Sequence, residues 1–275
     1  MVLSNSQWWA ASGEDASYVI ENSVMGDGVD GNASQVAGTE GDRRTFTIAG
    51  WIKRTALGAE EQIFSNYNGL GLPNNRSSRI NFAGNDKFEI SGQAGASNTY
   101  YLLTNAVFRD PSAWLHFQVD FDTTNSVESS RIVLRINGEV QSFGTATYPA
   151  QDLDTYYNWT STTNYLFSET GSEYDQMYLA QLVQSDGVLL DTNDLIEINS
   201  DGVAIAKDIS ELNLGDGDGT SGLWDFADSS DLGKDVSGNN NNWTDSFAAA
   251  DQTTDTPTDS GSTIGNFATM MPIYV

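Results

Sequence analysis

The sequence contains no cysteine and only one histidine, His116. Without thiols the chain cannot form disulfides, and one histidine does not supply the three or four protein ligands of a usual zinc site. Stability must therefore come from packing and hydrogen bonding. The sequence also lacks a G-x-S-x-G nucleophile elbow, so we expect His116 to have a structural role rather than a catalytic one.

Basic residues are also scarce. The 275 residues include 12 Lys and Arg against 38 Asp and Glu, which gives a formal net charge of -26. Beyond Arg135 the only basic residues are Lys207 and Lys234. A surface of this charge repels nucleic acid and anionic membranes, so no nucleic-acid partner is expected. The excess of acid fits a saline setting, where salt screens the repulsion, and it also favours solubility.

Long apolar runs are missing as well. No window approaches the roughly 18 apolar residues that a membrane-spanning helix needs, so we expect no membrane insertion. The first residues, MVLSNSQWWAASGEDASYVIENS, lack a basic segment followed by an apolar one, which is the pattern of a secretory signal peptide. We therefore expect no such signal.

Strand patterns dominate what is present. The run RTFTIAGWIKR places Phe46, Ile48 and Ile52 on one face and Thr47 and Trp51 on the other, as in a half-buried antiparallel strand. Further runs follow at regular intervals, separated by turn residues. They read EEQIFSNY, RINFAG, DKFEISG, TYYLLTN, AWLHFQVDFD, RIVLRINGEVQSF and YDQMYLAQLVQSD. The pattern predicts an all-β fold.

Two dipeptides and one later segment refine this prediction. Asn85-Asp86 and Asn137-Gly138 lie between strand-like runs and have the chemistry of hairpin turns. The segment VLLDTNDLIEINSDG contains the one short helix that we expect, with Thr192 or Asn193 as its N-cap. The last segment is rich in turn formers, but it repeatedly contains large apolar side chains, which are Leu223, Trp224, Phe226, Trp243 and Phe247. We expect it to fold back onto the sandwich.

Four of these runs, in this order, resemble the strands of the concanavalin A-like, laminin G-like jelly roll. They are TIAGWIKR, WLHFQVDFD, IVLRINGE and YDQMYLAQL, although Gln176 stands where that family usually has glycine. The resemblance implies an antiparallel β-sandwich with an N-terminal arm and a C-terminal extension packed back on it. We expect the arm and first edge strand over residues 1–42, the jelly-roll core over 43–190, and the acidic extension that completes the sandwich over 191–275.

A narrower resemblance covers almost the whole chain. The segments AVFRDPSAW, ATYPAQDLDTYYN, LGKDVSGNNNNWT, DTPTD and GNFATMMP are similar to those of laminin G-like proteins of tailed bacteriophages, marine and cyanobacterial phages in particular. The resemblance implies a structural protein exposed on the virion and assembled in the host bacterial cytoplasm. Such a protein is a tail fibre or appendage, or a head decoration. It also implies other virion proteins as partners and a homo-oligomeric state.

Catalysis is not expected. Enzymes of this sandwich type that cleave β-glucans carry E-x-D-x-E or E-x-D-x-x-E on a strand, because hydrolysis with retention needs two carboxylates about 5 Å apart. The sequence offers Glu173-Tyr174-Asp175, but Met177 and Tyr178 stand where the last acid is required. We expect a protein that binds or assembles and has no catalytic residues.

Calcium is the one cofactor that the sequence leaves open. Oxygen-rich turns present the hard ligands that Ca²⁺ prefers, and the candidate metal ligands are Asp27, Asp30, Asp216 and Asp218. None of these turns has the complete EF-hand spacing, so solvated turns are the alternative interpretation.

Glycan binding is the ligand function that we expect, with a host-surface glycan as partner. Sugar rings stack on aromatic faces, and their hydroxyls hydrogen-bond amides and carboxylates. The candidate residues are Asp154, Tyr156, Tyr157, Asn158 and Trp159, together with Asn66 and Tyr67. The alternative is a structural protein without ligand, in which these aromatics fill the sandwich edge. In either case Trp8 and Trp9 are candidates for an assembly contact.

Overall fold

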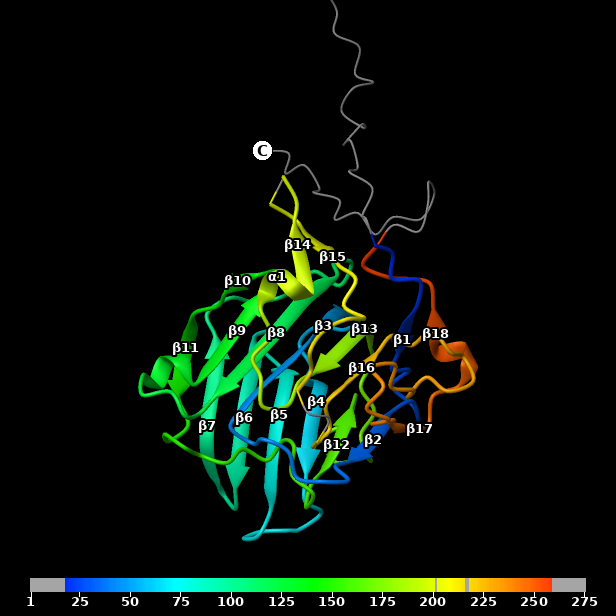
Figure 1. Ribbon diagram of the computed structural model, residues 1–275. Coiled ribbons are helices and arrows are strands. Elements are labelled where there is room, and N and C mark those ends of the chain that lie inside the picture. Colours follow the sequence, from blue (N-terminus) through cyan, green and yellow to red (C-terminus); the bar gives the residue numbers. More distant parts are fainter. Residues whose placement is uncertain (1–17, 201, 216–217, 259–275) are drawn as a thin grey trace, which may run out of the picture.

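The computed structural model describes residues 18–200, 202–215 and 218–258 (Figure 1). Two eight-stranded sheets, in which every strand pairing is antiparallel, form a sandwich, and a two-stranded hairpin lies outside them. The one α-helix of these residues, α1 (Thr192–Leu195), has four residues. No helix of the described chain is long and apolar enough to cross a membrane. The predicted all-β sandwich is confirmed.

The first sheet is built around the long strand β3. Its strands, in spatial order, are β10 (Glu139–Val140), β9 (Ile132–Ile136), β8 (Leu115–Asp122), β3 (Thr45–Arg54), β13 (Met177–Gln184), β1 (Ser23–Met25) and β18 (Gln252–Thr253), while β16 (Gly222–Trp224) pairs with β13.

The second sheet carries the surface that matters for function. Its strands, in spatial order, are β11 (Phe143–Thr147), β7 (Ser97–Thr104), β6 (Phe88–Ala94), β5 (Arg76–Phe82), β4 (Glu61–Tyr67), β12 (Thr163–Leu166), β2 (Ala33–Val36) and β17 (Thr244–Asp245).

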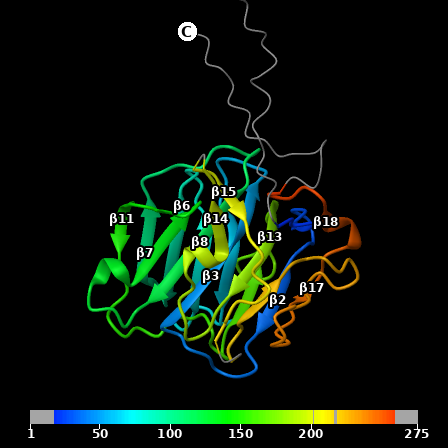
Figure 2. The same cartoon turned by 45° about the horizontal axis from the view of Figure 1, so that its top comes forward.

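Strand β3 is buried on both faces, which is more than its alternation predicts. Phe46, Ile48 and Ile52 point into the core between the sheets, as expected. The opposite face, with Ala49 and Trp51, is covered because the chain after residue 187 crosses the outer side of the first sheet. The hairpin of β14 (Ile196–Ile198) and β15 (Ala204–Ala206) belongs to this cover, and Figure 2 shows it against the first sheet. The outer face of the first sheet is therefore covered by the chain itself.

His116 lies under this cover. It is 2% exposed, and its ring centroid lies 5.2 Å from that of Trp51 in an edge-on arrangement. Burial lowers the pKa of His116 to about 3, because a buried imidazolium loses its hydration. The residue is a neutral packing group.

The C-terminal extension completes both sheets, as predicted. Strands β16, β17 and β18 pair with β13, β2 and β1, respectively. The rings of Trp224 and Trp243 pack 5.6 Å apart inside the core, and the Trp243 ring lies 5.5 Å from that of Phe64. Strands from the two ends of the described chain therefore lie side by side, and the extension contributes Trp224, Phe226, Leu232 and Trp243 to the core.

The predicted turns and helix are found close to their expected places. Asp86 and Asn137 have φ values of 64° and 51°, and Gly138 follows at 83°, as hairpin turns with left-handed residues require. Helix α1 begins one residue earlier than an N-cap at Thr192 predicts and two residues earlier than one at Asn193. Its N-cap is Asp191, whose side chain accepts a hydrogen bond from the backbone N–H of Asn193.

A buried guanidinium joins the two sheets at one end of the sandwich. Arg54, the last residue of β3, is 2% exposed. Its Nε and Nη2 each lie 2.8 Å from Oε2 of Glu61, the first residue of β4. Its Nη1 lies 3.2 Å from Asp86 Oδ1 and donates to the carbonyl of Phe108. Every charge in this cluster has a charged partner inside the protein.

Replacing Arg54 by Ala should lower the free energy of unfolding by about 3–5 kcal/mol, because it leaves Glu61 charged and buried without a partner. Chemical denaturation measures this loss. Arg44→Ala is the control, since its ion pair with Asp154 is half-exposed and such pairs contribute at most about 1 kcal/mol. A second variant, Arg54→Met with Glu61→Gln, should recover part of the loss. Equal losses in Arg54→Ala and Arg44→Ala would contradict this assignment.

Candidate functional site: a polar face on the second sheet

Alternate residues of β4 to β7 point away from the core and form a polar layer on the outer side of the second sheet, most of which is buried. Side chains in a strand alternate between the two faces of the sheet. The residues that fill the core from these strands include Phe64, Ile80, Ile90 and Leu102. Their neighbours on the outer face are almost all polar. We call them the Arg79 face, which consists of Gln62, Ser65, Arg79, Asn81, Glu89, Ser91 and Tyr101.

The pairing register arranges these residues in two neighbouring rows. One row runs through Ser65, Arg79, Ser91 and Tyr101, and Tyr165 of β12 lies beside Ser65 at its end. The next row runs through Gln62, Asn81, Glu89 and Leu103. Small hydroxyl and amide side chains therefore form the floor. Tyr165 and Tyr101, both half-buried, flank it on the outer strands.

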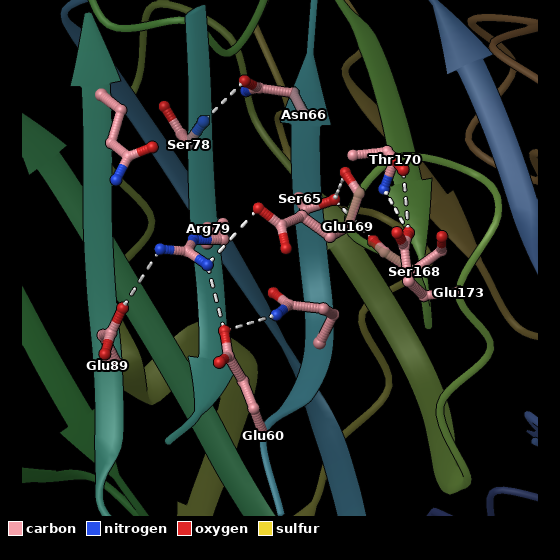
Figure 3. Close-up of polar contacts among 12 residues, drawn as sticks. Glu60, Ser65, Asn66, Ser78, Arg79, Glu89, Ser168, Glu169, Thr170 and Glu173 are labelled. Atoms are coloured by element: carbon pink, nitrogen blue, oxygen red, sulfur yellow. Dashed lines mark hydrogen bonds and ion pairs between the residues drawn. The ribbon is translucent and has the colours of Figure 1, made fainter. Parts of the chain in front are cut away.

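Arg79 is held at the centre of the face by three carboxylates. Its Nη1 lies 3.0 Å from Glu60 Oε1 and 3.4 Å from Glu169 Oε1, and its Nη2 lies 3.9 Å from Glu89 Oε1 (Figure 3). The Arg79 side chain is 17% exposed, Glu60 is 50% exposed and Glu169 is 39% exposed. Glu89 is buried and also accepts a hydrogen bond from the hydroxyl of Tyr101. We call Glu60, Glu89 and Glu169 the carboxylate cluster.

The segment after β12 forms one rim of the face. The hydroxyl of Ser65 donates to the carbonyl of Ser168 at 2.6 Å, which ties this segment to β4 (Figure 3). Farther along, the hydroxyl of Thr170 donates to Glu173 Oε2 at 2.8 Å. The rim therefore places Glu169 over the sheet and Glu173 close behind it.

The floor contains polar atoms without partners. Among the described residues, neither Oδ1 nor Nδ2 of Asn81 has a hydrogen-bond partner, and Ser91 Oγ and Gln62 Oε1 have none either. Asn81 is 0% exposed, Ser91 1% and Gln62 4%. A buried polar atom without a partner costs about 1–3 kcal/mol. These donors and acceptors are therefore unsatisfied among the described residues, and a ligand reaches them only if the side chains that cover them move.

Burial, with a further contribution from neighbouring negative charge, raises the pKa of two acids around the face. Burial raises the pKa of Glu169, Arg79 opposes that shift, and the neighbouring Glu60, Glu173 and Glu89 add to it. Burial likewise raises the pKa of Asp175 to about 6, with further contributions from Glu61, Glu60 and Glu173. Asp175 lies just before β13, where its Oδ2 accepts the backbone N–H of Gln62 at 2.7 Å.

The structure separates the loop residues that the sequence offered as glycan ligands. Tyr157 is 0% exposed and packs against Phe46, Phe64 and Phe121 in the core. Asn158 is also 0% exposed, and its side chain bonds the carbonyl of Asp42 and the side chain of Gln184. These two residues are structural, because the protein itself occupies all the space around them.

The rest of that loop lies at the surface. The Arg43 guanidinium stacks 4.5 Å above the half-buried ring of Trp159, which also contacts Tyr156. Tyr156 is 7% exposed, and Asp154 pairs with Arg44. Trp159 and Asp154 therefore remain accessible to a ligand.

The other two predicted glycan ligands, Asn66 and Tyr67, lie on opposite faces of β4. Asn66 is 0% exposed and points inward, where its Oδ1 accepts the backbone N–H of Ser78. It is a structural residue, since it pairs two strands of the sheet. Tyr67 follows on the outer face of β4 and donates its hydroxyl to the carbonyl of Leu70. It lies at the end of the strand, one row away from Ser65.

The calcium candidates that the structure describes, Asp27, Asp30 and Asp218, do not form a metal site. Asp27 Oδ1 accepts the backbone N–H groups of Val29, Asp30 and Gly31, as the cap of a tight turn. Asp218 Oδ1 instead accepts the hydroxyl of Thr39. Asp216 lies outside the described residues, as do the assembly candidates Trp8 and Trp9. Within the described ranges, no group of three or more acidic or histidine side chains could hold a metal ion.

For the residues of the Arg79 face, the sequence predicted strands but no binding site. The signal was nevertheless present in RSSRINF and KFEISGQA, where Arg79 and Asn81 alternate with Ile80 and Phe82, and where Glu89 and Ser91 flank Ile90. The same alternation occurs in any strand that has one face in water. What distinguishes it is the burial of the polar atoms and the convergence of Glu60 and Glu169, which come from outside these strands.

Comparison with known proteins gives similarity at the level of solved structures. No protein-family model and no curated protein matches the chain. A heptameric SAP-like pentraxin from Limulus polyphemus is 15% identical, with 63% of this chain and 80% of that one covered, at a TM-score of 0.42.

Two further solved structures are similar to the same extent. Domains LG4-5 of the mouse laminin alpha1 chain are 12% identical, with 65% of this chain and 45% of that one covered, at a TM-score of 0.43. The CBM40 of Ruminococcus gnavus IT-sialidase is 13% identical, with coverages of 64% and 97% and a TM-score of 0.41.

The ionisation of Asp175 should make the stability of the protein depend on pH. Its pKa is raised above the ordinary value of 3.8 to about 6, so its contribution to stability is present below pH 3.8 and is lost as the pH rises through 6. Asp175→Asn should therefore raise the free energy of unfolding at pH 8 by about 1–2 kcal/mol, allowing for partial exposure, and flatten its pH dependence. Urea denaturation across pH 4–8 measures both. Glu139→Gln, an exposed residue of β10, is the charge-matched control and should change neither.

Proposed function

We propose that this protein is a non-catalytic saccharide-binding β-sandwich whose ligand lies on the Arg79 face. The observation that carries the proposal is a set of buried polar atoms without partners on the outer side of the second sheet, which are both amide atoms of Asn81, Ser91 Oγ and Gln62 Oε1. Saccharide hydroxyls both donate and accept hydrogen bonds, so one sugar can satisfy an amide oxygen and an amide nitrogen together. The tyrosines at positions 101 and 165 flank this floor and offer rings for stacking.

The chemistry of the floor supports a polar ligand over an apolar one. An apolar partner would leave the amide of Asn81 desolvated and unpaired, which is unfavourable. A protein partner would cover the face mainly with apolar and aromatic side chains at its centre. A polyhydroxylated ligand is the class that matches both the hydroxyls and the amides.

Removal of the floor groups distinguishes a binding role from a structural one. Asn81→Ala and Ser91→Ala should each abolish or strongly weaken glycan binding, yet leave the unfolding temperature unchanged or higher, because each removes buried groups that have no partner. A glycan array and thermal denaturation provide the two measurements. Thr145→Ala, an exposed residue of β11 at the end of the same row as Leu103, is the control and should alter neither. A drop in unfolding temperature with binding retained would refute the assignment.

Trp159 offers a second surface for the same activity. Its ring is partly exposed and carries Arg43 on one face. If the ligand lay there, Trp159→Ala would abolish glycan binding and Asn81→Ala would not. The proposal expects the reverse, so this pair of variants locates the site.

The carboxylate cluster could in principle belong to a catalytic site. The raised pKa of Glu169 favours a general acid, which makes a glycoside hydrolase the second candidate. However, all three carboxylates lie within 4 Å of the Arg79 guanidinium. That group occupies the space between them, where a scissile bond would have to lie. Sugar release in a reducing-sugar assay, lost in Glu169→Gln, would establish the hydrolase instead.

The biological setting that we propose is the exterior of a tailed phage particle, as an appendage or a head decoration. The support is the similarity of segments along almost the whole chain to phage laminin G-like proteins, together with the acidic composition. Mass spectrometry of purified particles should detect the protein, and its absence from them would remove this part of the proposal. A purely structural virion protein would be detected there too, but would bind no glycan.

A further inference from the structure

The Arg79 face carries more negative than positive charge. Three carboxylates share one guanidinium, which leaves an excess of two negative charges when all three are ionised. Glu173 lies behind Glu169 on the rim. The ion pairs that the described residues form on this face all involve Arg79. The excess is therefore not balanced by a second basic side chain in contact with the cluster.

The guanidinium is not free to receive an anion. Its Nη1 faces Glu60 and Glu169, and its Nη2 faces Glu89. A carboxylate or sulfate of a ligand prefers the paired N–H groups of a guanidinium, but Nη1 already hydrogen-bonds Glu60 and Glu169, and Nη2 forms an ion pair with Glu89. An anionic group that approached Arg79 would also come close to Glu60 and Glu169, the two acids that are substantially exposed.

The floor offers hydrogen bonds that require no charge. Asn81 is 0% exposed and has neither a donor nor an acceptor for its amide among the described residues, and Ser91 Oγ lies in the neighbouring row of the sheet, also without a partner. These atoms are independent of the acids and point to a ligand that presents hydroxyl or amine groups.

We infer that the Arg79 face selects its saccharide by charge, with Glu60 and Glu169 as the specificity-determining residues. Neutral and amino-bearing sugars bind, whereas carboxylated and sulfated sugars are rejected. This inference rests on the saccharide-binding function proposed above. Like charges brought together at an interface suppress the wrong partner, and the net charge of -26 adds a long-range repulsion of the same sign. An ammonium group on the sugar would instead pair with the exposed carboxylates.

Glu89 has a different role from the other two acids. It is 6% exposed, and its Oε2 accepts the hydroxyl of Tyr101. It is thus a positioning residue, because it holds Arg79 on one side and Tyr101 on the other. The two acids that meet an incoming ligand are Glu60 and Glu169.

The test is a glycan array that presents the same backbones in neutral, amino, carboxylated and sulfated forms. The full chain should bind neutral or amino forms at least about tenfold more tightly than the carboxylated and sulfated forms of the same backbone, a factor that corresponds to 1.4 kcal/mol. The double variant Glu60→Gln with Glu169→Gln should gain binding of the carboxylated form relative to the neutral one, since it removes two negative charges beside Arg79. The gain should shrink as salt is added.

Controls separate this inference from the function on which it rests. Glu128→Gln with Glu139→Gln removes the same charge from exposed positions elsewhere, and it should leave the ranking of glycans unchanged. If the full chain binds no glycan on the array, the proposed function and this inference both fall. If it binds carboxylated or sulfated forms as tightly as neutral ones, or if the double variant gains nothing, only the charge selection falls.

Discussion

The buried guanidinium of Arg54 is the interaction on which the arrangement of this molecule most depends. It ends the central strand of the first sheet and pairs with Glu61, which begins β4 in the second sheet. It also reaches Asp86, in the turn between β5 and β6. A charge buried to this extent is tolerated only where its partners are held in place. The two sheets are therefore fixed relative to one another at this end of the sandwich.

The contact between Arg54 and Asp86 also helps to position the Arg79 face. Asp86 is further held by Arg109 and by the backbone N–H of Gly58, and the hydrogen bond from Arg109 contributes most to lowering its pKa to about 2. With this turn fixed, the register of β5 against β6 is fixed as well. A slip of one residue would exchange the two faces of a strand and place Arg79 in the core. The outer face thus depends on a pairing made at the end of the sandwich.

The sequence predicts much of the fold because the fold depends on local patterns. The sequence alone predicts the alternation of β3 and the left-handed turn at Asp86. It also shows the recurring aromatics, such as Trp224 and Trp243, that pack in the core. The cover over Trp51 was not predicted, because alternation describes one strand and not what crosses it. The site was missed for a similar reason. Arg79 and Asn81 look like solvated positions until Glu60 and Glu169, from separate loops, are seen to converge on them. Conversely, the composition of the loop from Asp154 to Trp159 predicted a glycan site, yet Tyr157 and Asn158 are buried structural residues.

The unpartnered groups of the Arg79 face raise the question of what offsets their cost. Asn is disfavoured within a strand, and β-branched residues such as Thr or Val suit such a position better. At Asn81 such a residue would also avoid the desolvation of two unpaired amide atoms, each of which costs about 1–3 kcal/mol. Folded proteins are stable by only about 5–15 kcal/mol, so this cost is a substantial fraction of the total. Packing within the described chain offers no compensation at this position, because the core contacts of β5 come from Ile80 and Phe82 on the opposite face. A ligand that hydrogen-bonds these atoms would offset the cost when bound, which is the physical reason for assigning the site to this face rather than to the aromatic loop.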